Sequence, residues 1–208
     1  MTEKKTKPNI ELIHDYGIDI RNRTIYLTSE YTWRDDTTES GTEFSLYSRF
    51  VKNMDILNNE NDSPITIKSS NIGGDWYYGM AIYDIIKKSK SPTNFYIDAY
   101  ACSMGSIIPQ AATKRYISKW ADFLVHLGTC EFSGESKSVA STFKHYETKT
   151  PLMYNIYAVR CINGDYFKSI NATSDDVVKY LKEMVDKHSE WWMSAEDALK
   201  FGFVDEIY

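Results

Sequence analysis

The sequence predicts a single α/β domain in which parallel strands alternate with crossover helices. Short β-prone runs at residues 23–27, 64–68 and 94–98 are separated by stretches whose apolar residues recur at helical spacing. Such alternation is typical of strand–helix–strand units. The chain has 208 residues, of which 42% are hydrophobic, and this is enough to form one core without disulfides or a metal.

The first part of the chain divides at its turn residues. We expect residues 1–22 to form a flexible lead-in with a turn at Gly17, followed by the strand at 23–27. A polar loop over 32–41 then leads to a helix whose apolar positions run from Phe44 to Leu57.

The rest of the chain continues the alternation as one domain from residue 23 to 208. After the strand at 64–68 and a turn at Gly73-Gly74, the pattern predicts helices at about 76–89, 103–113, 136–161, 174–188 and 194–200, and strands at 94–98, 116–118 and 123–125.

Charge and composition exclude several classes of function. The net charge of -5 comes from 24 basic and 29 acidic residues without a basic stripe, which argues against nucleic-acid binding. No apolar run approaches the roughly 20 residues of a membrane-spanning helix, and the charged N-terminus is unlike a secretory signal. Three widely spaced cysteines suggest neither a disulfide framework nor a metal knuckle, so we expect a cytoplasmic setting.

Three features are candidates for chemistry. Ser103 lies where a strand gives way to a helix, so the free N–H groups of the helix could stabilise an oxyanion beside its hydroxyl. Gly73-Gly74 could bring backbone close to a ligand, and His126 ends the apolar run 123–125. Taken singly, each has an ordinary structural explanation: a helix cap, a tight turn and a buried histidine with its hydrogen bonds satisfied.

Four motifs together resemble the proteolytic subunits of the Clp protease family. Gly73-Gly74 with the following Gly-Met-Ala-Ile-Tyr-Asp at 79–84 is similar to the family's glycine pair and helix. The run Ala-Cys-Ser-Met-Gly-Ser at 101–106 resembles its nucleophile motif, and Phe-Leu-Val-His at 123–126 its histidine motif. The segment 193–205 resembles its terminal Leu-Ser-Ala motif. The resemblance extends from about residue 19 to the C-terminus.

The resemblance implies a Ser–His–Asp triad. Ser103 would be the nucleophile and His126 the general base. The family's acid is placed eight residues before the serine of the Leu-Ser-Ala motif, here Ser194, and position 186 holds an aspartate, so Asp186 would orient His126. The backbone N–H groups of Gly74 and Met104 would form the oxyanion hole.

The family also implies an architecture and partners. Its fold is the Clp protease/crotonase spiral of β–α units with a protruding helical handle, and its subunits form heptameric rings or double rings. The implied function is a serine endopeptidase acting on peptides or unfolded proteins, with an AAA+ ATPase unfoldase as partner. Neither a metal-ligand cluster nor a phosphate-binding GxxxxGK[ST] loop is found, so no cofactor is expected and ATP would be used by the partner alone.

Several alternatives stay open. Divergent relatives include phage proteases that process head proteins, and the sequence does not separate that role from general proteolysis. An inactive scaffold subunit would lack one of Ser103, His126 or Asp186, and all three are present. An acyl-CoA enzyme of the crotonase type would be expected to carry carboxylates beside the oxyanion hole, and a Ser–Lys peptidase would use Lys114 or Lys119; the serine and histidine motifs argue against both.

Overall fold

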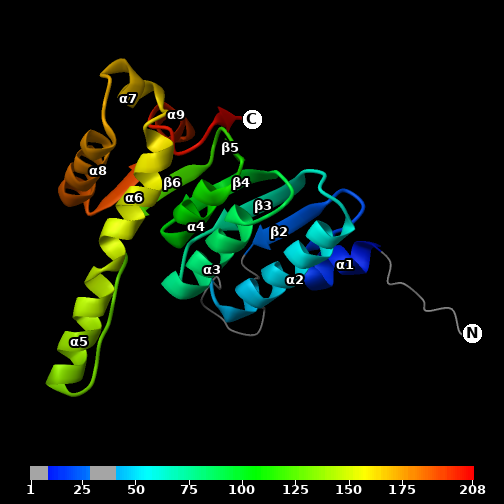
Figure 1. The fold of residues 1–208 in the computed structure, drawn as a ribbon, viewed down its shortest axis with the longest axis horizontal. Coiled ribbons are helices and arrows are strands. Elements are labelled where there is room, and N and C mark those ends of the chain that lie inside the picture. The colour runs from blue at the N-terminus through cyan, green and yellow to red at the C-terminus, as the bar shows by residue number, and fades with distance from the viewer. Residues whose placement is uncertain (1–8, 29–40) are drawn as a thin grey trace, which may run out of the picture.

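A computed structural model describes residues 9–28 and 41–208, which fold into an eight-stranded sheet and the helices around it (Figure 1). The elements in chain order are α1 (Asn9–Tyr16), β1 (Ile18–Asp19), β2 (Thr24–Thr28), α2 (Phe44–Glu60), β3 (Ile65–Asn71), α3 (Trp76–Lys87), β4 (Thr93–Cys102), α4 (Met104–Ile107), the 3-10 helix η1 (Ile108–Ala111), β5 (Lys114–Ile117), β6 (Asp122–His126), α5 (Ser136–Glu147), α6 (Lys149–Cys161), α7 (Asp165–Ser169), α8 (Ser174–His188), β7 (Glu190–Met193), α9 (Ala195–Lys200) and β8 (Glu206–Ile207).

Strand β4 is the centre of the sheet. Its first half pairs in parallel with β3 on one side and β5 on the other, and residues 100–102 pair in parallel with β6. One layer therefore has the order β1-β2-β3-β4-β5-β8, and β6 with β7 branches from the carboxyl end of β4. Apart from the antiparallel pairs β1–β2 and β6–β7, the pairings within the described residues are parallel. The expected α/β class is confirmed.

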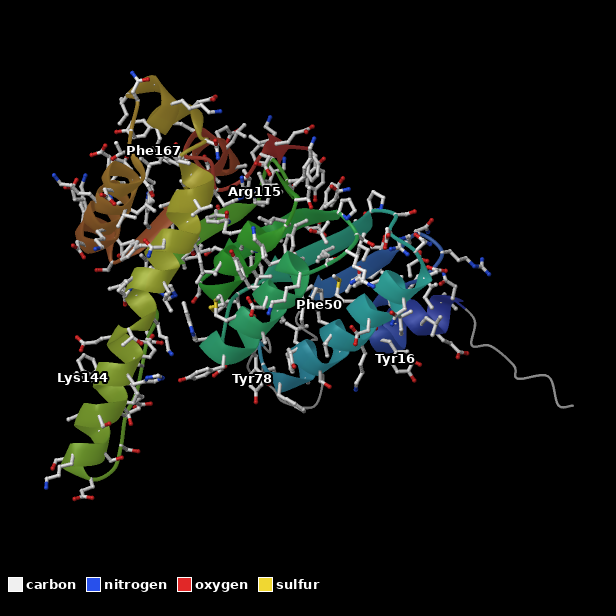
Figure 2. The ribbon with its side chains drawn as sticks, in the orientation of Figure 1. Tyr16, Phe50, Tyr78, Arg115, Lys144 and Phe167 are labelled. Atoms are coloured by element: carbon white, nitrogen blue, oxygen red, sulfur yellow. The ribbon has the colours of Figure 1, made fainter. Side chains whose placement is uncertain are left out.

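The main core lies between the sheet and helices α2 and α3. Along β3, Ile65 and Ile67 are fully buried whereas Lys68 is exposed, so this strand presents one apolar face. Helices α2 and α3 lie over the sheet in Figure 1, and Phe50 of α2 is buried there (Figure 2). Burial of one such side chain typically stabilises a fold by about 1.5–3 kcal/mol.

The same core continues into a group of packed aromatic rings that joins the C-terminal elements. Phe167 of α7 is buried (Figure 2), and Trp191 of β7 has its ring centroid 5.3 Å from that of Phe201 and 5.7 Å from that of Phe203. Helix α5 projects away from the rest of the domain in Figure 1 and continues into α6, which packs against α8. This arrangement agrees with the protruding helical handle that the family resemblance implies.

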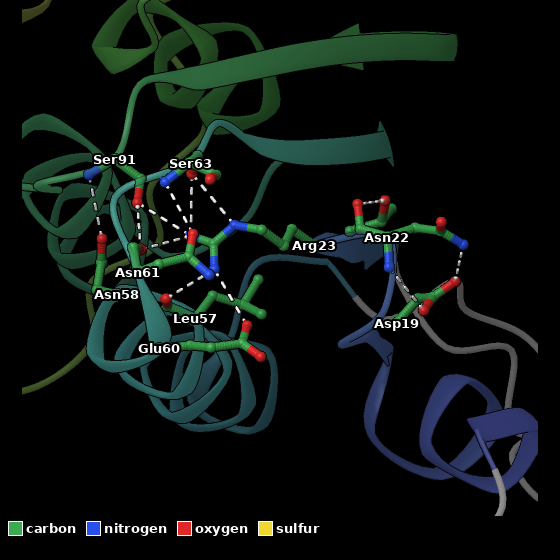
Figure 3. A network of polar contacts seen from close by, with 10 residues as sticks. Asp19, Asn22, Arg23, Leu57, Asn58, Glu60, Asn61, Ser63 and Ser91 are labelled. Carbon is green, nitrogen blue, oxygen red and sulfur yellow. Dashed lines mark hydrogen bonds and ion pairs between the residues drawn. The ribbon is translucent and has the colours of Figure 1, made fainter.

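Two buried arginines fasten chain segments together. The guanidinium of Arg23 donates hydrogen bonds to the carbonyls of Leu57, Asn61 and Ser63 at 2.9–3.0 Å, and so binds acceptors in the last turn of α2 and just beyond it (Figure 3). Arg115 of β5 binds both carboxylate oxygens of Asp205, and so ties the C-terminal segment to the sheet.

The structure differs from the sequence prediction at the N-terminus and around the C-terminal elements. Residues 9–22, expected within a flexible lead-in, contain α1 and β1, because Ile18 is buried and β1 pairs with β2. Residues 1–8 and most of the polar loop expected at 32–41 lie outside the described residues. The helix expected at 136–161 is divided at Thr148 into α5 and α6, and the short elements α7, β7 and β8 were not predicted.

Candidate active site

Ser103 occupies a sharp turn between β4 and α4. Its φ and ψ are 54° and −125°, a conformation that residues other than glycine rarely adopt and that commonly marks functional sites. The backbone N–H of Ser103 donates to the carbonyl of Leu124 at 3.2 Å, which holds the turn against β6. The side chain is half-buried and lines a cleft. This bond and the strained backbone place the Ser103 side chain at the cleft.

The glycine pair lies against this turn. A Cβ atom placed on Gly73, whose φ is +101°, would be 2.6 Å from the Cβ of Ser103, so only glycine lets the loop approach so closely. The Oδ1 atom of Asn71 accepts a hydrogen bond from the N–H of Gly73 at 2.8 Å, and the N–H of Thr42 donates to the carbonyl of Gly73 at 2.5 Å. These bonds fix the loop that carries Gly74.

Two backbone donors at the site are free to bind an anion. Among the described residues, neither the N–H of Gly74 nor that of Met104 has a hydrogen-bond acceptor. Both residues line the same cleft as Ser103. Free N–H groups beside a serine hydroxyl are suited to a developing oxyanion.

His126 ends β6 and lines the cleft with Ser103. Burial lowers the pKa of its imidazole below the ordinary value, and the carboxylate of Glu190 raises it in part. The Nε2 atom is buried and has no hydrogen-bond partner in the described part of the chain. No hydrogen bond joins His126 to Ser103 here; in unliganded enzymes such bonds are often long and tighten when substrate binds.

The carboxylate beside His126 is Glu190. It lies directly opposite His126 in the antiparallel pairing of β6 with β7, so their side chains are on the same face of the sheet. Asp186 is exposed on α8 and is absent from the cleft lining, and its charge raises the pKa of Tyr154, after the larger effect of burial. The structure therefore brings Ser103, His126, Gly74 and Met104 to one cleft, whose lining includes neither Asp186 nor Glu190; of the two carboxylates, Glu190 is the one paired with His126 across β6 and β7.

Sequence reasoning missed Glu190 because it missed β7. The alternation of exposed Glu190, buried Trp191, exposed Trp192 and buried Met193 was the available signal. Four residues directly after a long helix make a weak strand pattern, and the pairing with His126 is a tertiary contact that spacing does not reveal.

The cleft has a volume of about 570 Å³ and is lined by residues of β6 and α3 and, from the handle, of α5 and α6. Its apolar lining comes from Ile72, Trp76, Ile107, Leu127 and Met153. Such a volume and lining are suited to side chains of a peptide-sized ligand.

A polar contact joins α3 to the handle beside this cleft. The Tyr77 hydroxyl of α3 and the Lys149 ammonium of α6 each lie 3.2 Å from Nε2 of His145 on α5, and the ammonium is 5.0 Å from the centre of the Tyr77 ring. Because Tyr77 and Lys149 also line the cleft, the handle forms part of its wall.

The described residues offer no group of three or more His, Cys, Asp or Glu that could hold a metal ion. Cys102, Cys130 and Cys161 are not joined in disulfides. Helices long and apolar enough to cross a membrane are not found in the described part of the chain.

The family model described as Clp protease matches residues 20–208, which is most of the chain. The chain belongs to the Clp protease family. Among its relatives is the ATP-dependent Clp protease proteolytic subunit of Deinococcus radiodurans, which is 24% identical over 168 residues, covering 79% of this chain and 75% of that protein. The subunits of Streptococcus mutans and Streptococcus pyogenes are 27% and 26% identical, covering 74% and 71% of this chain and 72% and 70% of theirs. Membership of the Clp protease family supports a peptidase.

Proposed function

We propose that this chain is a serine endopeptidase that hydrolyses peptide bonds in the cleft between the sheet and the handle. The observation that supports this best is the convergence of a strained serine, a histidine and two free backbone N–H groups on one cleft. The Clp protease family match over residues 20–208 supports the same reaction.

In the proposed mechanism, the Ser103 hydroxyl attacks the carbonyl carbon of the scissile peptide bond. His126 accepts the hydroxyl proton as the bond to carbon forms, and the carbonyl oxygen becomes an oxyanion held by the N–H groups of Gly74 and Met104. The intermediate collapses as His126 gives its proton to the departing amine, leaving an ester on Ser103. A water molecule, deprotonated by His126, hydrolyses that ester and restores the serine.

We assign the orienting carboxylate to Glu190. Its position opposite His126 and its effect on the pKa of the imidazole support this role. Asp186, the residue that the motif spacing predicts, remains the alternative, and it would need to move toward His126 to act.

The test is peptidase activity on a fluorogenic peptide, compared among Ser103→Ala, His126→Ala, Glu190→Gln and Asp186→Asn. Loss of a triad serine or histidine lowers kcat by about 10⁶-fold and loss of the acid by about 10⁴-fold. We expect Glu190→Gln to lose at least 100-fold and Asp186→Asn to stay near wild type. Loss in Asp186→Asn alone would return the role to Asp186, and activity in Ser103→Ala would end the proposal.

We further propose that copies of the chain assemble into a ring in the cytoplasm that works with an ATPase partner. The names of the relatives, which are proteolytic subunits of ATP-dependent proteases, support this. So does the face of the sheet opposite α2 and α3, where Tyr96 and Tyr116 stack with their ring centroids 4.5 Å apart and are partly exposed. Parallel sheets are usually covered on both faces, so a neighbouring copy is a candidate to cover this one. Sedimentation velocity tests this; a monomer at all concentrations would exclude the ring.

A further inference from the structure

A chain of buried hydroxyls leads from the handle to the serine turn. The Tyr157 hydroxyl of α6 lies 2.8 Å from the Oγ atom of Ser106, and that oxygen lies 2.7 Å from the carbonyl oxygen of Ser103. Ser106 is 0% exposed and Tyr157 is 1% exposed. Neither residue lines the cleft, so neither is in position to contact a substrate.

The direction of each hydrogen bond follows from its acceptor. A carbonyl oxygen accepts and never donates, so the Ser106 hydroxyl proton points to the carbonyl of Ser103. The Tyr157 hydroxyl must then donate to Oγ of Ser106. Burial raises the pKa of the Tyr157 phenol far above its ordinary value, so the phenol keeps this proton at every working pH.

The carbonyl of Ser103 and the N–H of Met104 belong to one peptide group. That group is planar and trans, so its C=O and N–H point in opposite directions. Besides Oγ of Ser106, the backbone N–H groups of Ser106 and Ile107 donate to the same carbonyl at 2.9 and 3.3 Å. With the oxygen held on the α4 side, the Met104 N–H points the other way, and Met104 lines the cleft.

We propose that Ser106 and Tyr157 are positioning residues that aim the Met104 N–H at the oxyanion of the reaction. This inference rests on the proposed function, because it requires attack by Ser103 and an oxyanion in the cleft. The chain of hydroxyls also polarises the peptide group, which makes its N–H a stronger donor. Because Tyr157 belongs to α6, the orientation of this donor depends on how α6 is seated against α4.

The experiment measures kcat and KM on a fluorogenic peptide, together with inhibition by a peptide aldehyde, whose adduct with serine places an oxyanion in the same site. Ser106→Ala and Tyr157→Phe remove the two hydroxyls, and Ser106→Thr keeps one. Tyr154→Phe is the matched control, since Tyr154 is equally buried on α6 and its hydroxyl is outside the chain of bonds. Thermal unfolding of every variant is measured alongside.

We expect kcat of Ser106→Ala to fall about 10-fold and that of Tyr157→Phe about 5-fold, with KM within about 2-fold, since loss of a whole oxyanion donor lowers kcat by about 10²–10³. Aldehyde affinity should weaken in proportion to kcat. The double variant Ser106→Ala/Tyr157→Phe should have the kcat of Ser106→Ala, because Ser106→Ala alone already breaks the row of hydrogen bonds from Tyr157 to the Ser103 carbonyl. Ser106→Thr should recover most of the activity, and Tyr154→Phe should keep the wild-type kcat.

Wild-type kcat in both deletion variants, or an equal loss in Tyr154→Phe, would overturn the inference. A lowered melting temperature with unchanged kcat would likewise show a structural role alone. If Ser106→Ala does not fold, Tyr157→Phe, which loses a single oxygen atom, decides the question. If the wild-type protein neither hydrolyses the peptide nor binds the aldehyde, the proposed function itself fails. If the wild type is active and the variants that lack these hydroxyls are equally active, only the positioning role of Ser106 and Tyr157 fails.

Discussion

Replacing Gly73 by alanine should disable the site, because the new Cβ would be about 1 Å too close to Ser103. The new Cβ would lie 2.6 Å from the Cβ of Ser103, 2.8 Å from the carbonyl oxygen of Cys102 and 3.0 Å from the backbone nitrogen of Met104. Carbon atoms in contact prefer about 3.5–4.0 Å, so the glycine loop or the serine turn must shift by roughly 1 Å. A 1 Å displacement of reacting groups can lower the rate by about 100-fold.

The same substitution also strains the backbone. At φ +101° a side chain with a Cβ is disfavoured by about 1–3 kcal/mol, which corresponds to a fall in melting temperature of roughly 3–10 °C for a chain of this size. Gly134→Ala separates strain from collision, because Gly134 has φ +139° and a Cβ there meets nothing within 4 Å.

The assay is kcat on a fluorogenic peptide and thermal unfolding of wild type, Gly73→Ala and Gly134→Ala. We expect at least a 100-fold lower kcat in Gly73→Ala and a near wild-type kcat in Gly134→Ala, with both melting temperatures lowered. Wild-type turnover in Gly73→Ala would show that the close approach of Gly73 to Ser103 is not needed for activity, and an equal loss of turnover in Gly134→Ala would show that strain alone lowers it.

Three further predictions concern pH and stability. Burial lowers the pKa of His126 more than Glu190 raises it, and the base must be neutral to accept a proton, so kcat/KM should rise with pH with a midpoint below 6.5. Glu190→Gln should move this midpoint to still lower pH. A midpoint above pH 7 in wild type would contradict this. Arg115→Met removes a buried guanidinium that donates to Asp205, to Gln110 and to the carbonyls of Gly202 and Phe203, and leaves Asp205 with the Arg160 guanidinium at 3.7 Å as its cationic partner. It should lower the melting temperature by at least about 6 °C, measured by calorimetry. Burial raises the pKa of Asp205, but its hydrogen bonds and charge interaction with Arg115 outweigh burial, and the net shift is downward. The stability that the Arg115–Asp205 pair gives wild type should therefore be lost as pH falls below about 4. Arg115→Met should lose less stability over the same pH range, whereas a variant destabilised elsewhere should lose as much as wild type.

The serine turn and the glycine loop were predictable because their geometry is local. A strand followed by Ala-Cys-Ser-Met-Gly predicts an exposed hydroxyl beside free N–H groups, and Ser103 has that position. The order of strands and helices was predictable for the same reason, since each of the longer elements carries its own apolar period.

The pairing that sets Glu190 opposite His126 was not predictable from spacing, and the choice between Glu190 and Asp186 as the orienting carboxylate stays a prediction. Glu190 reaches His126 through the pairing of β7 with β6, two strands separated by α5, α6, α7 and α8. Asp186 falls one helical turn earlier, on an exposed face of α8. Ser106 and Tyr157 were missed similarly, because their contact joins α4 to α6 and leaves no mark in either local sequence.

Reaction of the purified protein with a fluorophosphonate probe, followed by mass spectrometry of its peptides, tests most directly whether Ser103 is an activated nucleophile. We expect one adduct, on Ser103, in wild type, and none in Ser103→Ala or His126→Ala. A probe adduct on another serine, or labelling that persists in Ser103→Ala, would contradict it.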